Sequence, residues 1–258
     1  MKHILLFSFS LLFASPGSFA QCHPATLEQK ASYVNVVNTL QQQFKNNMPP
    51  GNWRIFDERH SLDNLELSNE FGRLFHVCGD RYNLTLERAG TAQARQTRLN
   101  NAASQPDTLT RQPRSLVLST DSVYREADPS RAQQLAESTI DIDVEMNAGN
   151  YRLEEPVSNR FVSSYKTITI NGVPLALQVQ LKRDKNGITP RPETVILLGN
   201  WKNNLSADSR SNKMYHYSFT KGGNLVENLV ITIKGPIEVA NEIVQKIDWR
   251  AIGNTLTK

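Results

Sequence analysis

The sequence contains 258 residues, of which 29 are lysine or arginine and 25 are aspartate or glutamate, and its formal net charge is +4. A positive charge this small and this evenly spread does not indicate nucleic-acid binding, so we expect no nucleic-acid partner. The length is sufficient for one large domain or two small ones.

Residues 1–20 have the layout of a secretory signal peptide. A basic start at Lys2 precedes an apolar run from Ile4 to Ala14, and Ser18 and Ala20 are small residues at the two positions that a signal peptidase reads. The apolar run is about half of the roughly 20 residues that a membrane-spanning helix needs. We therefore predict cleavage after Ala20, a mature chain without a transmembrane segment, and a periplasmic or secreted location.

The chain has two cysteines, Cys22 and Cys78. In an exported protein, an even number of cysteines indicates a disulfide, and two free buried thiols are the alternative. Closing a loop of this length contributes about 4 kcal/mol to stability in the chain-entropy model. We predict a Cys22–Cys78 bond that holds the mature N-terminus against the body of the fold.

His23 is the third residue of the predicted mature chain. A histidine at this position behind a free amine can enclose a square-planar Cu(II) or Ni(II) ion. However, an N-terminal Gln21 cyclises readily, and cyclisation removes the amine that such a site needs. We therefore expect a solvated histidine, no bound metal and no cofactor, and keep His23 as the one candidate ligand.

A change in composition divides the chain. Segment 101–114 is rich in proline and in small polar residues, which is typical of a linker or a long surface loop. We predict an N-terminal α+β subdomain with the disulfide over residues 21–100, this linker, and an antiparallel-sheet domain with a closing helix over residues 115–258.

The N-terminal segment begins with an amphipathic helix between residues 25 and 47. Its apolar residues recur at helical spacing: Tyr33, Val37, Leu40 and Phe44. A short strand over 52–58 follows. Two more strands flank a turn at Gly79–Asp80, and the second has its apolar residues on one face: Tyr82, Leu84 and Leu86.

The C-terminal segment is rich in strands. Residues 138–148 alternate apolar and acidic side chains, so their acidic residues are expected on a solvated face: Asp141, Asp143 and Glu145. Residues 166–182 predict a hairpin with a two-residue turn at Asn171–Gly172. Two strands follow over 193–201 and 212–220, and the second is predicted to pair with a strand over 225–235.

A closing helix is predicted from Pro236, with apolar residues at helical spacing: Ile237, Ala240, Val244 and Ile247. The pattern of elements predicts the α+β class. The fold is expected to be mainly an antiparallel sheet, with the N-terminal amphipathic helix and the C-terminal helix packed on one face.

The densest set of reactive side chains lies near the predicted disulfide: Asp57, Glu58, His60 and His76. A histidine–carboxylate pair formed from these residues suits acid–base chemistry. The sequence has no serine elbow, zinc-ligand spacing or phosphate-binding glycine loop that would give such a pair a task. These four residues are the catalytic candidates, and surface ion pairs are the alternative interpretation.

Three aromatic residues share one face of the strand over 212–220: Tyr215, Tyr217 and Phe219. Such a ladder belongs either to the core or, if it faces solvent, to a surface that binds a partner protein.

We predict an exported, non-catalytic binding protein that engages another protein, such as an inhibitor or immunity-type protein or an accessory factor of the bacterial envelope. A secreted hydrolase that uses Asp57 with His60 or His76 is one alternative. A carrier of a small ligand or lipid, with a pocket under the closing helix, is the other.

Overall fold

A computed structural model describes residues 22–61, 65–68, 76–78, 81–90, 137–153, 161–183, 190–202, 206–207, 213–220 and 224–257. The predicted leader (1–20) and the predicted linker (101–114) lie outside this part of the chain. Within it, none of the helices combines the length and the apolar composition needed to cross a membrane.

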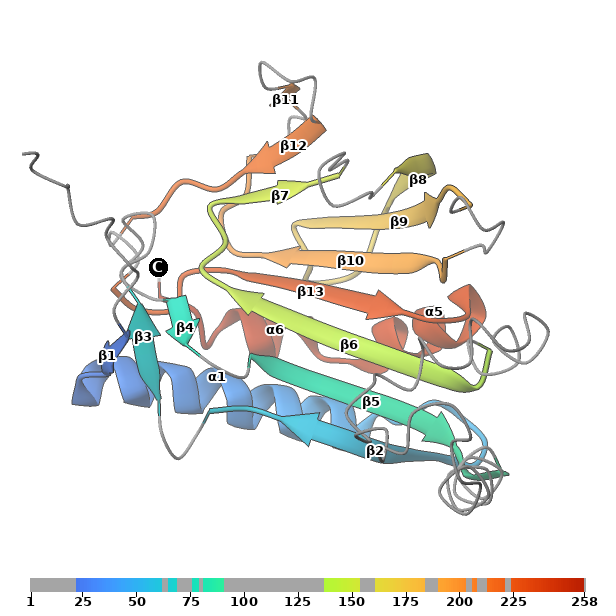
Figure 1. Ribbon diagram of the computed structural model, residues 1–258, viewed down its shortest axis with the longest axis horizontal. Coiled ribbons are helices and arrows are strands. Elements are labelled where there is room, and N and C mark those ends of the chain that lie inside the picture. Colours follow the sequence, from blue (N-terminus) through green and yellow to red (C-terminus); the bar gives the residue numbers. More distant parts are fainter. Residues whose placement is uncertain are drawn as a thin grey trace, which may run out of the picture.

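The largest element of the fold is an antiparallel sheet of seven strands (Figure 1). From one edge to the other, its strands are β2 (Trp53–Arg59), β5 (Tyr82–Arg88), β6 (Thr139–Met146), β13 (Leu229–Lys234), β10 (Glu193–Leu198), β9 (Leu175–Leu181) and β8 (Val162–Ile168). β5 pairs with β6 from Tyr82↔Val144 to Glu87↔Thr139. Strands from both sides of residues 101–114 therefore share this one sheet.

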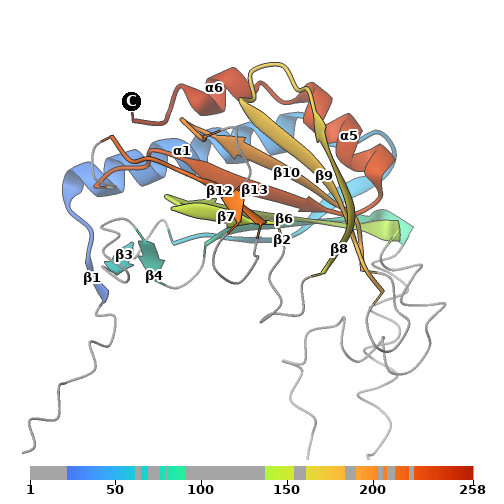
Figure 2. The same ribbon diagram turned by 90° about the horizontal axis from the view of Figure 1, so that it is seen from above.

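Three helices of the described chain lie on one face of the sheet: α1 (Leu27–Asn46), α5 (Ile237–Lys246) and α6 (Trp249–Gly253) (Figure 2). At the start of α1, the Thr26 hydroxyl accepts a hydrogen bond from the Gln29 N–H, and the Gln29 side chain accepts one from the Thr26 N–H. These bonds satisfy N–H groups that the first helical turn leaves free. The predicted α+β class, with a mainly antiparallel sheet, is confirmed.

The larger hydrophobic core lies between the helices and the sheet. The alternating apolar side chains of β5 and β6 face it, and the predicted stripe of α1 packs against them. All of these side chains are buried: Tyr33, Val37, Leu40, Phe44, Tyr82, Leu84, Leu86, Ile140, Ile142 and Val144.

A smaller hydrophobic core lies on the opposite face of the sheet, over β9 and β10. A second sheet contributes to it, with the order β11 (Ser206–Ala207), β12 (Lys213–His216) and β7 (Asn150–Arg152). Leu177 of β9 and Val195 of β10 meet Tyr215 of β12 in this core. Part of the face without helices is thus covered by the chain itself.

The predicted pairing of the strand over 212–220 with the strand over 225–235 is wrong. β12 pairs with β7 and β11, whereas β13 lies between β6 and β10. The physical reason is burial, because β13 places Leu229, Ile231 and Ile233 in the larger core and Val230 in the smaller one, which fits the centre of a sheet. β12 has exposed side chains at Lys213 and His216, which suit a small sheet at the surface.

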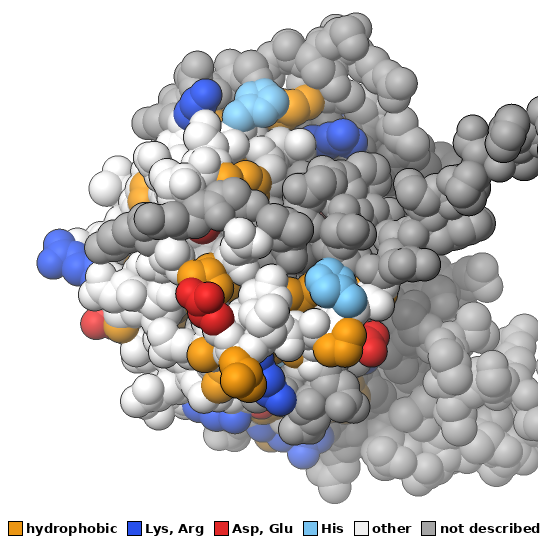
Figure 3. All heavy atoms as spheres, turned by 90° about the vertical axis from the view of Figure 1, so that its left-hand side faces the viewer, with side chains coloured by type: hydrophobic (Ala, Val, Ile, Leu, Met, Phe, Trp, Pro, Cys, Tyr) orange, Lys and Arg blue, Asp and Glu red, His pale blue; other side chains and the backbone are white. Residues whose placement is uncertain are grey.

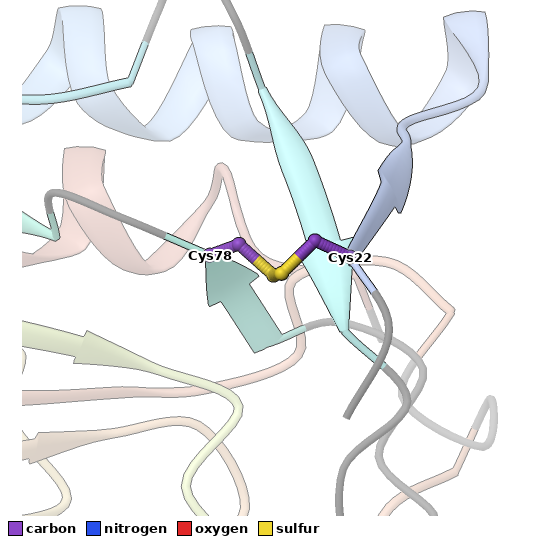
Figure 4. The surroundings of a disulfide bond; sticks show 2 residues. All are labelled: Cys22 and Cys78. Carbon is purple, nitrogen blue, oxygen red and sulfur yellow. A yellow bond between two sulfur atoms is a disulfide. The ribbon is translucent and has the colours of Figure 1, made fainter. Parts of the chain in front are cut away.

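A third sheet consists of β1 (Cys22–Pro24), β3 (Glu66–Ser68) and β4 (His76–Cys78). The predicted disulfide is present in it, with a Cα–Cα distance of 6.2 Å between Cys22 and Cys78. Figure 4 shows that the bond joins the two outer strands across β3. Because β1 leads directly into α1, the disulfide ties the start of α1 to the rest of the fold.

The hairpin of β8 and β9 contains its turn at Asn171–Gly172, as predicted, but the connection is longer than two residues. The Val173 N–H donates to the Ile170 C=O across the turn, and Gly172 has φ of 82°. The ladder ends at Ile168↔Ala176, so residues 169–174 all lie outside it. The loop rises to the level of α6 (Figure 2), where a Cβ on Gly172 would come within 2.8 Å of Arg250 Cγ.

Candidate functional site

The two carboxylates of the predicted catalytic set lie on opposite faces of β2. Asp57 is opposite Thr85 in the ladder, and Glu58 is opposite Leu84, whose side chain belongs to the larger core. Asp57 Oδ2 accepts a hydrogen bond of 2.7 Å from Arg59 on the face without helices. Because adjacent residues of a strand point to opposite faces, one histidine cannot serve both carboxylates.

Glu58 lies on the helix side, where it has two partners. Its Oε2 is 3.2 Å from Lys45 Nζ of α1, and its Oε1 accepts a hydrogen bond of 3.1 Å from the Tyr82 hydroxyl. Burial, together with the Glu58 carboxylate, raises the pKa of Tyr82 well above its usual value of 10.0. These contacts give Glu58 a structural role under α1.

The raised pKa of Tyr82 predicts a loss of stability at high pH. In the unfolded chain the phenol ionises near pH 10.0, whereas burial keeps it protonated in the folded chain. The contribution of Tyr82 is therefore complete below pH 10 and falls as pH rises above it, by up to about 1.4 kcal/mol per pH unit. We expect the Tyr82→Phe variant to show a shallower fall in the free energy of unfolding between about pH 10 and pH 12. Urea unfolding curves measure this slope, and an unchanged slope would contradict the assignment.

The two histidines of the catalytic set lie near the ends of short elements. His60 follows β2 and is partly buried, and its Nδ1 has no hydrogen-bond partner among the described residues. The backbone of His76 pairs with Ser68, and its side chain lies outside the described part of the structure. No hydrogen bond joins His60 to Asp57 or Glu58 within the described residues. A catalytic role for this set stays a prediction.

His23, the candidate metal ligand, is exposed on β1, where its backbone pairs with Leu67 of β3. The residue before Cys22, which the proposed terminal site also needs, lies outside the described residues. Among the residues that the structure describes, no three histidine, cysteine or acidic side chains gather in a way that suits a metal ion.

The aromatic ladder is part of the smaller core. Tyr215 and Tyr217 are only 5% and 9% exposed, and Phe219 is partly buried against the same cluster. The Tyr217 ring lies edge-on to Trp201 and Phe219, with centroid distances of 5.2 Å and 4.9 Å. The Tyr217 hydroxyl also donates to the Glu227 C=O. The structure thus matches the core interpretation, and this ladder does not form a solvent-facing patch for a partner.

A charged groove of about 510 Å³ lies on the part of this sheet face that the smaller core leaves open. Its acidic side chains are matched by basic ones. Asp141 pairs with Arg191, and Asp143 pairs with Lys234 at 2.7 Å. The predicted acidic row of β6 is therefore neutralised by neighbouring residues, and the groove has no surplus of basic side chains that would attract an anion.

A larger groove of about 710 Å³ lies between the β8–β9 hairpin and the helices α5 and α6. Three exposed cations line it, one from each of these elements: Lys166, Lys246 and Arg250. None of the three forms an ion pair within the described residues. We call this site the hairpin groove.

The hairpin groove has a surplus of positive charge. Its one acidic residue is Asp248, whose Oδ1 accepts hydrogen bonds of 3.1 Å from the N–H groups of Arg250 and Ala251 at the start of α6. Arg250 Nη2 donates to Asn171 Oδ1 in the hairpin turn, which holds the guanidinium at the groove. An anionic group therefore fits this groove better than a cationic one.

β8 borders the hairpin groove and forms the last strand of the seven-stranded sheet. Among the described residues it pairs with β9 alone, and its side chains from Ser163 to Thr167 are exposed. Phe161 and Tyr165 are among the few exposed large hydrophobic residues, at 43% and 40% exposure. Figure 1 shows β8 beyond β9, at the edge of the seven-stranded sheet opposite β2.

The backbone groups of Tyr165 and Thr167 point out of this edge. In an antiparallel ladder, successive residues direct their N–H and C=O groups alternately to the two sides. The Lys182 N–H donates to the Phe161 C=O, which sets the phase of the β8–β9 ladder. β8 has a β-bulge between Val162 and Ser164, so the alternation is counted along β9, where Lys182, Gln180 and Gln178 face β8. Lys166, opposite Gln178, therefore faces β9, and its two neighbours in β8 point away from the sheet.

A bond on the far side of β10 gives the same phase independently. The Gly235 N–H donates to the Pro192 C=O, so the even-numbered residues of β10 face β13 and the odd-numbered ones face β9. Val179 and Leu177, which are opposite odd-numbered residues of β10, therefore direct their backbone groups toward β10. Tyr165 and Thr167 are opposite these two residues in β8, so their backbone groups point outward, away from β9.

The opposite end of the molecule, which carries β1, β3 and β4, has no comparable feature on its described surface. Figure 3 shows acidic, basic and hydrophobic side chains interspersed there. Among the described features, a free strand edge beside a groove with surplus charge occurs at β8.

Sequence reasoning did not find the hairpin groove, because its lining comes from two segments that are far apart in the chain, residues 166–178 and 241–250. The asparagine–glycine turn and the closing helix were the available signals, but neither shows that the two pack together. Comparisons with protein-family models, with curated proteins and with solved structures give no match.

Proposed function

We propose that this chain is an exported, non-catalytic binding protein that engages another protein by adding an extended segment of it to the edge of β8. The observation that carries the proposal is the outward direction of the Tyr165 and Thr167 backbone groups at an otherwise exposed edge. Such N–H and C=O groups are a template for a further strand.

The sequence of β8 adds support. Natural sheet edges are commonly blocked by proline, by several charges or by a covering segment. β8 has the sequence VSSYKTI, with one charged residue and no proline. Its exposed Tyr165 provides a large apolar surface beside the free edge, which suits a protein partner.

Export is proposed on the signal-peptide pattern of residues 1–20 and on the Cys22–Cys78 disulfide. A disulfide is typical of compartments outside the cytoplasm. Within the class of exported binding proteins, an inhibitor or immunity-type protein and an accessory factor of the envelope both fit a strand-adding surface.

The two alternatives have less support from the geometry. A hydrolase at the predicted catalytic set needs a histidine–carboxylate pair, whereas Asp57 pairs with Arg59 and no hydrogen bond joins it to His60 within the described residues. A lipid carrier needs an apolar cavity, whereas the groove beside the closing helix has cations and amides among its lining residues: Lys166, Asn171, Gln178, Asn241, Gln245, Lys246 and Arg250.

The test is affinity capture from an envelope extract with the mature protein, residues 21–258, and with two variants of Thr167. Proline at position 167 removes an outward N–H but no bond to β9, so Thr167→Pro is expected to fold. It should weaken binding of the captured partner at least tenfold, because a strand hydrogen bond is lost and the ring obstructs the edge.

The matched control is Thr167→Val, which keeps the N–H and the β-branched shape, and it should bind like the wild type. Isothermal titration with the purified partner measures both affinities. Equal binding by the proline and valine variants would contradict strand addition. Recovery of no partner, together with a hydrolytic activity that His60→Ala abolishes, would favour the enzyme.

A further inference from the structure

We propose that the hairpin groove selects partners whose added strand carries acidic side chains at alternate positions. This inference rests on the proposed function, because it concerns the segment that is added to β8. The backbone edge of β8 does not determine which side chains the added segment carries, whereas the charge of the hairpin groove does.

The first step is the direction of the side chains of β8. Lys166 is opposite Gln178 in the ladder, and Gln178 Nε2 donates a hydrogen bond of 2.7 Å to Asn241 Oδ1 of α5. Lys166 therefore shares the helix side of the sheet with Gln178, and both line the hairpin groove. Tyr165 points to the opposite face.

The second step is the alternation of the added strand. Neighbouring residues across an antiparallel pair point to the same face, so every second side chain of the added segment faces the groove. There it meets Lys166 from the strand, Lys246 from the last turn of α5 and Arg250 from α6. The residues between them lie on the face of the exposed Tyr165 ring.

The positive charge of the hairpin groove favours acidic side chains in the added segment. The three cations have no ion-pair partner within the described residues, and the groove's one carboxylate, Asp248, accepts two N–H groups of α6. An aspartate or glutamate above the groove gains attraction to these cations, whereas a lysine or arginine is repelled. The expected partner segment thus alternates acidic residues with apolar or aromatic ones.

The other grooves do not share these properties. The groove on the open face of the sheet contains acidic residues that are already paired with Arg191 and Lys234. The small space beside Tyr33 and Tyr82 has a volume of about 10 Å³, which is too small for a side chain. Among the described residues, unpaired cations and a free strand edge therefore coincide at the hairpin groove.

The experiment selects from a displayed library of random ten-residue peptides against the immobilised mature protein. The probes are the wild type, Thr167→Pro and a groove variant with three reversed charges: Lys166→Glu, Lys246→Glu and Arg250→Glu. A matched control variant carries the same change in net charge at exposed sites that do not line the groove: Lys30→Glu, Lys202→Glu and Lys213→Glu.

We expect peptides bound to the wild type and to the control variant to be enriched in aspartate and glutamate at every second position. The groove variant should lose this enrichment. For a single enriched peptide, the groove variant should raise the Kd roughly tenfold, because several half-exposed ion pairs become repulsive contacts. The Kd for the wild type should also rise with salt concentration.

Two results would overturn the inference, and they separate it from the proposed function. If peptides bind the wild type and not Thr167→Pro, but show no acidic alternation, strand addition stands and the acidic preference is wrong. If no peptide prefers the wild type over Thr167→Pro, strand addition itself is wrong and the preference fails with it. Thermal unfolding of each variant shows that it is folded when it is tested.

Discussion

The double variant Cys22→Ser, Cys78→Ser is expected to lose about 4 kcal/mol in its free energy of unfolding. The bond closes a loop between residues that are 56 positions apart, and its loss enlarges the conformational freedom of the unfolded chain. In the folded chain it is also the covalent link between β1 and β4. Denaturant unfolding under oxidising conditions measures the difference between the variant and the wild type.

Reduction provides the control for the disulfide prediction. Wild-type protein unfolded in the presence of a thiol reductant should match the double variant, because both lack the covalent link. The reductant should leave the double variant unchanged. If the variant were as stable as the oxidised wild type, the disulfide would not be a main tether of the N-terminal sheet.

The second large effect is expected at Trp249, where substitution by alanine should cost about 3–5 kcal/mol. Trp249 is 1% exposed, and its Nε1 donates a hydrogen bond of 2.7 Å to the Val244 C=O at the end of α5. Its Cβ also lies where the hairpin turn approaches α6, 3.5 Å from the position of a Cβ on Gly172. Alanine therefore leaves a cavity beneath the hairpin groove.

Trp53→Ala is the matched control for the tryptophan prediction. Trp53 is partly exposed at the edge strand β2, where the Arg88 guanidinium lies 5.2 Å from its ring centre. Its removal should cost less, because less apolar surface returns to water. Denaturant unfolding of both variants tests the order of the two losses. A loss smaller than about 1 kcal/mol for Trp249→Ala would show that α6 is not important for the core.

The elements that the sequence predicts well are those whose signal is local. The alternation of Ile140, Ile142 and Val144 with acidic residues predicts β6, and the stripe of α1 follows the helical period. In both, each apolar side chain faces the same core. The count of two cysteines and the predicted export together predict the disulfide, because only one pairing is available.

The features that escape the sequence depend on contacts between distant segments. The short distance along the chain favours a hairpin of β12 with β13, but β13 contributes side chains to both hydrophobic cores and takes the central position between β6 and β10. Tyr215 and Tyr217 carry the same alternation in a core or on a binding surface, and the packing of β7 and β12 over the sheet decides between the two. Lys166, Lys246 and Arg250 converge for a similar reason, because the hairpin turn packs on α6.

The separation of β1 from β8 has a practical consequence for experiments on this protein. The two elements lie at opposite ends of the long dimension of the molecule in Figures 1 and 2. A biotin, a fluorophore or a solid support attached just before Cys22 therefore leaves the strand edge turned toward the solution. The same layout means that an N-terminal fusion domain can be carried without obstructing access to that edge.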